Sequence, residues 1–250
     1  MNKVVVVGSS IQPRAGKFTY SQTRSKFDAD ERYRQTIFTV NSLMNCLPDA
    51  RIIIVDSSED YSQYFPDFSI FKNVEYVSLK ELSYSAFEEV NTNLNKSYCE
   101  NLLLNTFYSK FKKELLTYDY IIKATGRYFY YNLTDVLFNE ENVDKIFFKK
   151  PLKFPWNDAW NYWMIDRRNI ENDNLLKQYC TVLYAFGSRH LEKMIDINLA
   201  TMNLINSPEM KHYDIETLSY YLTRPYQENM IETNWIVSGW DGVTGRYMYY

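Results

Sequence analysis

Two hydrophobic patterns follow one another near the start of the chain. Residues 4–7 are a short, continuous apolar run of β-branched side chains, and residues 51–55 contain another after Arg51. Such runs are typical of strands that are buried on both faces of a parallel sheet. Between them, apolar side chains recur every three to four positions, at Tyr33, Ile37, Val40, Met44 and Leu47. This spacing predicts an amphipathic helix, so the segment as a whole predicts a βαβ crossover.

The limits of this helix are also visible in the sequence. Asp28 as N-cap, with Glu31 three residues later, resembles the start of a capping box, and Pro48 marks the end of the helix. The preceding residues 11–27 are polar and contain several cationic side chains, Arg24 among them. They predict a long loop that is cationic in part.

The same reasoning extends to the rest of the chain. We expect strands at residues 74–79, 120–122, 146–148, 162–165, 181–186 and 234–237. We expect helices at residues 82–90, 97–116, 189–205 and 215–222, the last two capped by Ser188 and Asp214. The prediction is an α/β, Rossmann-like fold: one domain over residues 1–250, with a mostly parallel central sheet flanked by helices. We expect residues 1–130 to form a nucleotide-type half and residues 131–250 an elaborated second half, the location expected for acceptor and catalytic residues if the chain is an enzyme.

Composition and charge exclude several classes of protein. Hydrophobic residues make up 46% and charged residues 24% of the chain, as in ordinary globular proteins. The net charge of −3 is unlike that of a dedicated duplex-DNA binder. No apolar stretch is long enough to span a membrane. Two histidines and three widely spaced cysteines argue against a zinc site or a disulfide framework and suggest a reducing compartment. With seven glycines, the chain contains no glycine-rich phosphate motif.

Polar residues follow three of the expected strands. In open α/β sheets, ligands bind beyond the carboxyl ends of the strands. Hydroxyl and carboxylate groups there can bond a base and a ribose, and Lys or Arg can neutralise a diphosphate. The alternative is that these residues only form turns and caps. With Arg24 from the long loop and Lys96 from the start of the long helix, the candidate ligand-binding residues are Ser9, Ser10, Arg24, Asp56, Ser57, Ser58, Lys96, Lys123, Thr125, Gly126 and Arg127.

The order of elements, with Asp56-Ser57-Ser58 after the second strand and Lys123-Ala124-Thr125-Gly126-Arg127-Tyr128 after the long helix, resembles nucleotide-sugar glycosyltransferases of the GT-A type. It is similar in particular to small bacterial and phage transferases with a Lys-x-[Ser/Thr]-Gly-Arg-Tyr segment. The glycine-containing residues 237–245 resemble their closing loop. GT-A enzymes usually carry a metal-binding Asp-x-Asp where this chain has Lys123 and Arg127, so the resemblance implies metal-independent transfer, with these two cations in the role of the metal. The literal match Asp28-Ala29-Asp30 is better explained by N-capping.

An inverting transferase also needs a base that takes a proton from the acceptor. In the resembling enzymes a carboxylate near a helix of the C-terminal half serves, which makes Glu216 the first candidate, followed by Asp214 and Asp158. The alternative for Glu216 is an ordinary first-turn acid favoured by the helix dipole. Trp156, Trp160 and Trp163 form either an acceptor platform or part of the core.

The resulting prediction is a glycosyltransferase that moves a sugar from a nucleotide-sugar donor, expected to be a UDP-sugar, to a glycan or another hydroxyl acceptor. No cofactor, metal, nucleic-acid partner or membrane span is expected, and the expected location is the cytoplasm of a bacterium or a phage-infected cell. Two alternatives stay open: a non-catalytic carbohydrate- or nucleotide-binding protein on a degenerate transferase fold, and a single-stranded nucleic-acid binder. The oligomeric state, the sugar and the stereochemistry are open.

Overall fold

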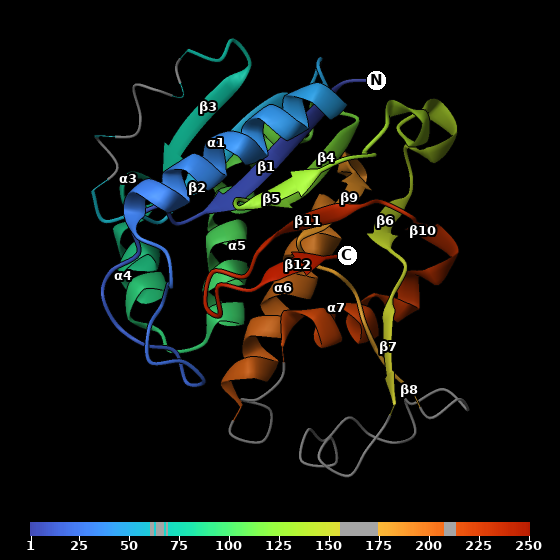
Figure 1. Ribbon diagram of the computed structural model, residues 1–250. Helices are drawn as coiled ribbons and strands as arrows, with labels where there is room; N and C mark the ends of the chain where they lie inside the picture. The colour runs from blue at the N-terminus through green and yellow to red at the C-terminus, as the bar shows by residue number, and fades with distance from the viewer. Residues whose placement is uncertain (61–62, 64–67, 69, 156–174, 208–213) are drawn as a thin grey trace.

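A mixed sheet runs through the centre of the molecule and has helices on both faces (Figure 1). The computed structural model describes residues 1–60, 63, 68, 70–155, 175–207 and 214–250. Four neighbouring strands pair in parallel: β1 (Lys3–Ser9), β2 (Arg51–Asp56), β3 (Val74–Ser78) and β4 (Tyr120–Thr125). Three further strands, β6 (Ile146–Lys149), β9 (Leu183–Gly187) and β10 (Met230–Thr233), complete it in the order β10-β6-β9-β4-β1-β2-β3. The prediction of a mostly parallel sheet flanked by helices in one domain is confirmed.

Strand β9 is antiparallel to both of its neighbours, β4 and β6. It therefore joins the strands of the two predicted halves of the chain into one continuous sheet. Apolar β-branched side chains explain the buried centre of this sheet, because residues 4–7 and 52–55 have no exposed area.

Each face of the sheet is covered by different helices. Helix α1 (Ala29–Cys46) packs Val40 and Leu43 on the face that carries Val5 and Val7 of β1. The opposite face, which carries Val4 and Val6, is covered by α4 (Tyr84–Thr92), α5 (Lys96–Leu115), α6 (Leu191–Asn206) and α7 (Ile215–Thr223). Alternation along β1 thus divides the core into two layers. None of the described helices is both long and apolar enough to cross a lipid bilayer.

Shorter elements were not predicted. A small antiparallel sheet consists of β5 (Tyr128–Tyr130), β11 (Val237–Trp240) and β12 (Tyr247–Tyr249), and a hairpin consists of β7 (Leu152–Pro155) and β8 (Leu175–Gln178). The helical turns are α3 (Leu79–Leu82), η1 (Asp135–Leu137), η2 (Glu140–Asn142), η5 (Ser188–His190) and η6 (Arg224–Asn229). Strands of three or four residues are too short to show a clear period in a sequence.

Two predictions about the second half were wrong in detail. The strand predicted at residues 234–237 begins only at Val237, the first residue of β11. Residues 234–236 connect β10 to β11, because Asn132 bonds the backbone on both sides of Trp235 and the indole enters the core. Ser188 is not the N-cap of α6; it begins the 3₁₀ turn η5, and α6 has no side-chain cap. The predicted strand at residues 162–165 and the tryptophan loop lie outside the described residues.

The caps of α1 and α7 were predicted correctly. The Asp28 carboxylate accepts from Glu31 N at 2.8 Å, and the Asp214 carboxylate accepts from Thr217 N at 2.8 Å. The reciprocal half of the capping box is absent at α1, because the Glu31 carboxylate accepts from Gln35 Nε2 instead.

We predict that Gly187→Ala destabilises the fold by about 1–3 kcal/mol, as overpacked cores do. A Cβ at Gly187 would lie 1.8 Å from the carbonyl oxygen of Val143, a backbone atom that cannot move by itself. The matched control is Gly8→Ala in β1, where the nearest atom would be the flexible end of Leu103 at 3.9 Å. Thermal unfolding should show a lower midpoint for the first variant alone; equal midpoints would contradict the predicted close packing.

Candidate functional site

A cleft opens at the carboxyl ends of β1, β2 and β4. Including its open mouth and the solvent in it, the cleft encloses about 740 Å³. Seven of the residues predicted from the sequence line it: Ser9, Ser10, Arg24, Ser57, Lys96, Thr125 and Arg127. Parallel pairing explains this gathering, because Ser9 lies beside Asp56 in one register and Gly8 beside Thr125 in the other.

The loop of residues 10–27 forms one wall of the cleft, and two arginines fasten it. Arg24 is 9% exposed and donates to three carbonyl oxygens at the end of α4, those of Val90, Asn91 and Asn93, at 2.6–3.1 Å. Its guanidinium also lies 4.5 Å from the centre of the Phe18 ring. Arg24 therefore lines the cleft while its hydrogen bonds satisfy a helix end.

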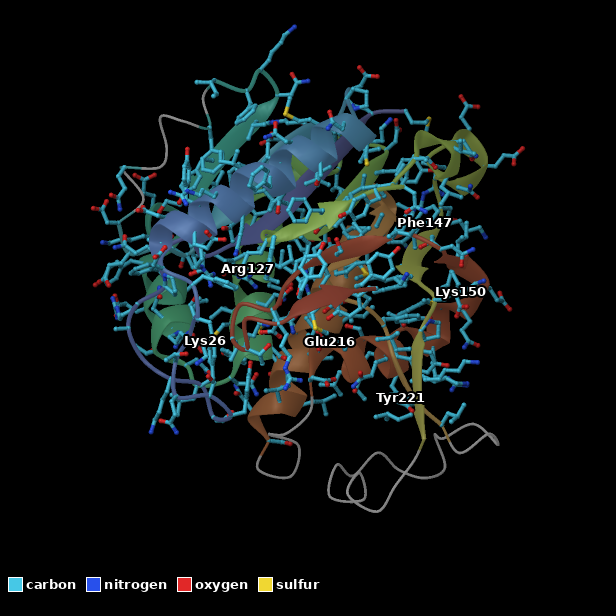
Figure 2. All side chains as sticks on the ribbon, viewed as in Figure 1. Lys26, Arg127, Phe147, Lys150, Glu216 and Tyr221 are labelled. Carbon is cyan, nitrogen blue, oxygen red and sulfur yellow. The ribbon has the colours of Figure 1, made fainter. Side chains whose placement is uncertain are left out.

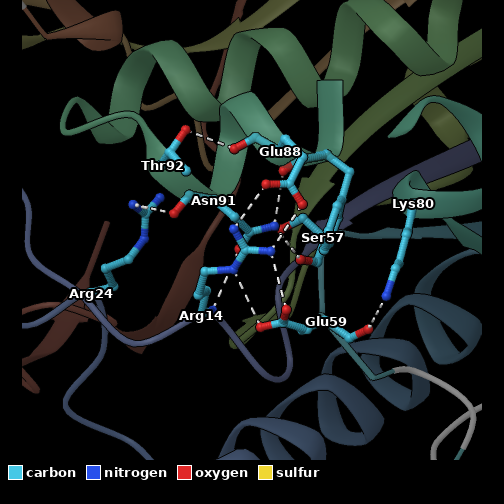
Figure 3. A network of polar contacts seen from close by, with 9 residues as sticks. Arg14, Arg24, Ser57, Glu59, Lys80, Glu88, Asn91 and Thr92 are labelled. Atoms are coloured by element: carbon cyan, nitrogen blue, oxygen red, sulfur yellow. Dashed lines mark hydrogen bonds and ion pairs between the residues drawn. The ribbon is translucent and has the colours of Figure 1, made fainter. Parts of the chain in front are cut away.

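Arg14 is the second arginine that holds this loop in place, and it was not among the predicted site residues. Its guanidinium lies between the carboxylates of Glu59 and Glu88, with hydrogen bonds of 3.0–3.3 Å (Figure 3). These bonds raise the pKa of Arg14 and lower that of Glu88. Asn91 continues the network, because its amide donates to the carbonyl oxygens of Ser57 and Phe87. The network ties the loop to the end of β2 and to α4.

Two other arginines meet in the cleft without a carboxylate partner. Arg32 of α1 is 4% exposed, and it donates to Ser10 O at 2.5 Å and to Ser25 Oγ at 2.9 Å. Arg127 lies nearby, and its buried Nε has no hydrogen-bond partner. No ion pair found among the described residues involves either side chain. Burial, and then the charge of Arg127, lower the pKa of Arg32, with Asp56 acting weakly in the opposite direction. A bound anion would offset the cost of this arrangement.

The backbone at Arg127 is unusual and is held by α1. Its φ of 90° is rare for a residue with a side chain. Thr39 Oγ1 accepts from the backbone N–H groups of Arg127 and Tyr128 at 2.9 and 3.1 Å, which fixes the turn after β4. Gly242 makes room for the guanidinium, since a Cβ there would lie 2.9 Å from Arg127 Cζ. Backbone strain maintained in this way is common at functional sites.

Several predicted site residues use their polar groups in hydrogen bonds within the fold. The Asp56 carboxylate accepts from the N–H groups of Ile11 and Ser58 at 2.9 and 2.7 Å, and Ser58 Oγ accepts from Gln12 N at 2.8 Å. Neither side chain lines the cleft, and both hold the start of the loop. Gly126 is also outside the lining; its N–H donates to Gly8 O at 3.0 Å.

Lys123 is the clearest departure from the expected arrangement. Its side chain is completely buried, and Nζ donates to Glu100 Oε1 at 2.5 Å, Thr125 Oγ1 at 2.7 Å and Thr181 O at 2.5 Å. An ammonium group has three N–H bonds, so all of them point to protein oxygen atoms. The expected contact between Lys123 and a diphosphate is therefore not supported by this geometry.

Glu216, labelled in Figure 2, lies at the start of α7, is half-buried, and is not among the residues that line the cleft. Thr181 Oγ1 donates to Glu216 Oε1 at 3.0 Å, and the Thr181 carbonyl accepts from Lys123, which links Glu216 to Glu100 in the cleft wall. Burial, followed by repulsion from Asp214 and Glu100, raises the pKa of Glu216 to about 7. A carboxyl group with this pKa suits proton transfer near neutral pH.

The other two catalytic candidates differ from Glu216. Asp214 caps α7 and also accepts from Gln178 Nε2 at 3.0 Å; burial raises its pKa. These bonds give Asp214 a structural role. Asp158 lies outside the described residues. Arg32 was missed as a site residue, although it forms a polar row on α1 with Thr36 and Thr39 at spacings of three to four, which would have indicated a buried polar stripe.

The described residues that line the cleft offer few ligands for a divalent metal. Over the described ranges, no three His, Cys, Asp or Glu side chains come together in a way that could hold an ion. Glu100, the carboxylate in the lining, is committed to Lys123, and the pKa of Glu100 is lowered although burial opposes this shift. The donor set here is cationic, unlike the carboxylate oxygens that hard cations prefer.

No protein family matches the chain in a search of family models, and no curated protein sequence matches it. Among solved structures, apo mouse xyloside xylosyltransferase 1 is similar with a TM-score of 0.52 and 9% identity, over 93% of this chain and 84% of that one. Galactosyltransferase LgtC with donor and acceptor sugar analogs, and an active-site mutant of LgtC, each have a TM-score of 0.48, with 11% and 10% identity. They cover 93% of this chain and 73% and 72% of their own. The first likeness establishes a shared GT-A-like fold.

Proposed function

We propose that this protein is a glycosyltransferase that uses a nucleotide-sugar donor, with a UDP-sugar as the expected donor. The observation that carries the proposal is the pair Arg32 and Arg127, which line the cleft together at the carboxyl ends of the parallel strands. Arg32 and the Nε of Arg127 are buried, and neither side chain takes part in an ion pair with a carboxylate of the described residues. An anion with two charges, such as a diphosphate, fits this pair. The shared fold with a protein named as a xylosyltransferase supports sugar as the group transferred.

In the proposed function, each part of the cleft contacts a different part of the nucleotide-sugar donor. Arg127 and Arg32 bind the diphosphate and stabilise the negative charge that grows on it as the sugar leaves. Lys96 adds a third cation at the edge of the lining. Ser9 and Ser57 offer hydrogen bonds to the ribose or the base. We propose transfer without a metal, since arginines stand where a metal would bind.

The acceptor half centres on Glu216. Its carboxylate takes the proton from the attacking hydroxyl of the acceptor, so that the new bond to the sugar forms as the bond to the diphosphate breaks. Lys96 and Glu100, which line the cleft, are close enough to Glu216 to shift its pKa, and this supports a role for Glu216 at the edge of the cleft. The acceptor is a glycan or another molecule with a free hydroxyl.

Calorimetric titration with UDP, UDP-sugars and GDP-sugars tests the donor proposal. We expect binding in the micromolar range, about −8 kcal/mol, unchanged by EDTA and by added Mn²⁺. Inorganic diphosphate should compete, because the arginines bind the phosphate groups. Absence of binding to every nucleotide would contradict the proposed function, and binding that is lost in EDTA would contradict metal independence alone.

A non-catalytic nucleotide- or carbohydrate-binding protein is the second candidate. One observation favours it: Glu216 is not among the residues that line the cleft. Such a protein would bind nucleotides as well, so binding does not separate the two candidates. An activity assay separates them: sugar transfer by the wild-type protein that is lost on substitution of Glu216 identifies the enzyme.

A further inference from the structure

The small sheet of β5, β11 and β12 has one face that is unusually aromatic. The register pairs Ser238 with Phe129 on one side and with Tyr249 on the other, and it pairs Trp240 with Tyr247. Paired and alternate residues point to the same side of a sheet. Together with Phe38 of α1, which packs on Phe129, we call these residues the aromatic face: Phe38, Phe129, Tyr131, Ser238, Trp240, Tyr247 and Tyr249.

The opposite side of this small sheet is ordinary core. Tyr128, Tyr130 and Val237 are each at most 5% exposed and pack with α1 and the central sheet. The aromatic face differs sharply: Phe38 is 54%, Tyr131 57%, Tyr247 53% and Tyr249 71% exposed. Exposed apolar surface of this kind on a folded protein marks an interaction site.

The rings on this face form a connected row. Phe38 and Phe129 have ring centres 5.9 Å apart, Phe129 and Trp240 lie edge to face at 5.7 Å, and Trp240 and Tyr247 lie edge to face at 5.1 Å. Neighbouring rings therefore hold each other in fixed orientations. A ligand that stacks on them does not have to order them first.

Hydroxyl groups run beside the rings. Ser238 Oγ lies 2.9 Å from the Tyr131 hydroxyl and 2.7 Å from the Tyr247 hydroxyl, so one buried serine joins two exposed phenols. None of the seven side chains is charged. The face thus combines flat apolar rings with neutral hydroxyl groups, a composition that suits the C–H faces and hydroxyl groups of neutral sugars.

The aromatic face is joined to the wall of the cleft through the backbone of residues 240–242. Trp240 N donates to Arg127 O at 3.3 Å, and Gly242, two residues later, lines the cleft against the Arg127 guanidinium. Trp240, at one edge of the aromatic face, is therefore a backbone neighbour of the cleft residue Arg127.

We infer that the aromatic face binds a neutral oligosaccharide, the acceptor of the reaction. This inference rests on the proposed function and names the class of its acceptor: a neutral glycan of two or more sugar units. Stacking on Trp240 and Phe129 and hydrogen bonds to the Tyr131 and Tyr247 hydroxyl groups hold the glycan, and its end reaches the cleft.

The experiment measures glycan binding directly, without a donor. Saturation-transfer NMR and titration calorimetry are carried out with neutral oligosaccharides of glucose, galactose, mannose and N-acetylglucosamine. We expect at least one series to bind, with affinity rising with chain length. Trp240→Ala should weaken oligosaccharide binding about tenfold. The double variant Tyr247→Ala, Tyr249→Ala should have a similar effect, and because both side chains are exposed, the protein should still fold. The matched control is Tyr84→Ala, which removes a tyrosine that is 63% exposed on α4, away from the face.

Two outcomes would overturn the inference. In one, no neutral oligosaccharide binds, or binding is equal in the wild type and the face variants. In the other, the protein dimerises in solution and Trp240→Ala abolishes the dimer, so that a second copy covers the face. Nucleotide binding is measured in the same variants and should be unchanged. Loss of glycan binding with intact UDP binding therefore tests the face, whereas absence of UDP binding in the wild type contradicts the proposed function instead.

Discussion

Glu216→Gln is expected to slow sugar transfer about 10²- to 10⁴-fold, the range that general base catalysis supplies. Glutamine keeps the shape and can still accept the hydrogen bond from Thr181, but it cannot take a proton. Nucleotide affinity should stay within about twofold, because Glu216 is not part of the cleft lining. The measurements are initial rates of transfer and calorimetric titration with UDP.

The pH dependence provides an independent readout of the same group. The pKa of Glu216 is raised to about 7, and the base must be ionised to act. The rate should therefore fall about tenfold for each pH unit below 7 and level off above it. The rate that remains in Glu216→Gln should lack this step.

Stability should change in the opposite sense with pH. Between the ordinary pKa of 4.5 and the raised value of about 7, the folded chain keeps a proton on Glu216 that the unfolded chain has lost. Folding stability from this group therefore falls as pH rises through that window. Glu216→Gln removes this loss, so its melting temperature at pH 8 should equal or exceed that of the wild type.

A control and a contrary result complete the test. Glu192→Gln changes an exposed acid of α6 that pairs with Lys112 and should leave transfer unchanged. If Glu216→Gln transfers sugar at the wild-type rate, Glu216 is not the base. If the wild type transfers no sugar to any acceptor but binds UDP, the non-catalytic alternative is correct.

Arg127→Ala is expected to weaken UDP binding about 10- to 100-fold, or about 1.5–3 kcal/mol, the usual contribution of a hydrogen bond to a charged group. The larger effect should be on transfer, because the arginine also stabilises charge on the leaving diphosphate. UDP should lose more affinity than uridine, which lacks the phosphates. Calorimetry with both ligands measures the difference.

Stability separates this role from a structural one. The Nε of Arg127 is buried without a hydrogen-bond partner, the backbone φ of Arg127 is 90°, and the positive charge of Arg127 repels that of Arg32. Removal of the guanidinium should leave the melting temperature unchanged or raise it, as happens when a costly functional group is deleted. Arg127→Lys should recover part of the affinity, since it restores the charge without the bidentate geometry. Arg246→Ala, an exposed arginine near the same turn, should have no effect; equal losses in both variants would contradict a specific site.

The strands and helices that build the sheet could be predicted because their patterns are local. Residues 4–7 and 51–55 read as buried strands, and the spacing of apolar residues located α1 and α5 to within a residue or two. The short strands β5, β11 and β12 could not be found this way. They exist because residues far apart in sequence pair with one another, and Asn132 rather than a strand partner satisfies the backbone beside Trp235.

The candidate site, too, could be predicted from the sequence only in part. The sequence indicated which polar segments would meet, because parallel strands bring their carboxyl ends to one edge of a sheet. It did not indicate which side chains would stay available within that group. Lys123 looked like a diphosphate ligand, but Glu100, Thr125 and Thr181 take all its hydrogen bonds. Arg32 was not among the candidates from the sequence, but it lines the cleft together with Arg127.

The sequence by itself thus determined the fold class, the edge of the sheet where the cleft forms, and the caps of α1 and α7, since each depends on neighbouring residues or on strand direction. The tertiary structure alone decided which cations are left without carboxylate partners, how far the pKa of Glu216 rises, and that aromatic residues of β5, β11 and β12 share one exposed face. These properties depend on burial and on distances between residues up to about a hundred positions apart, and no local pattern encodes them.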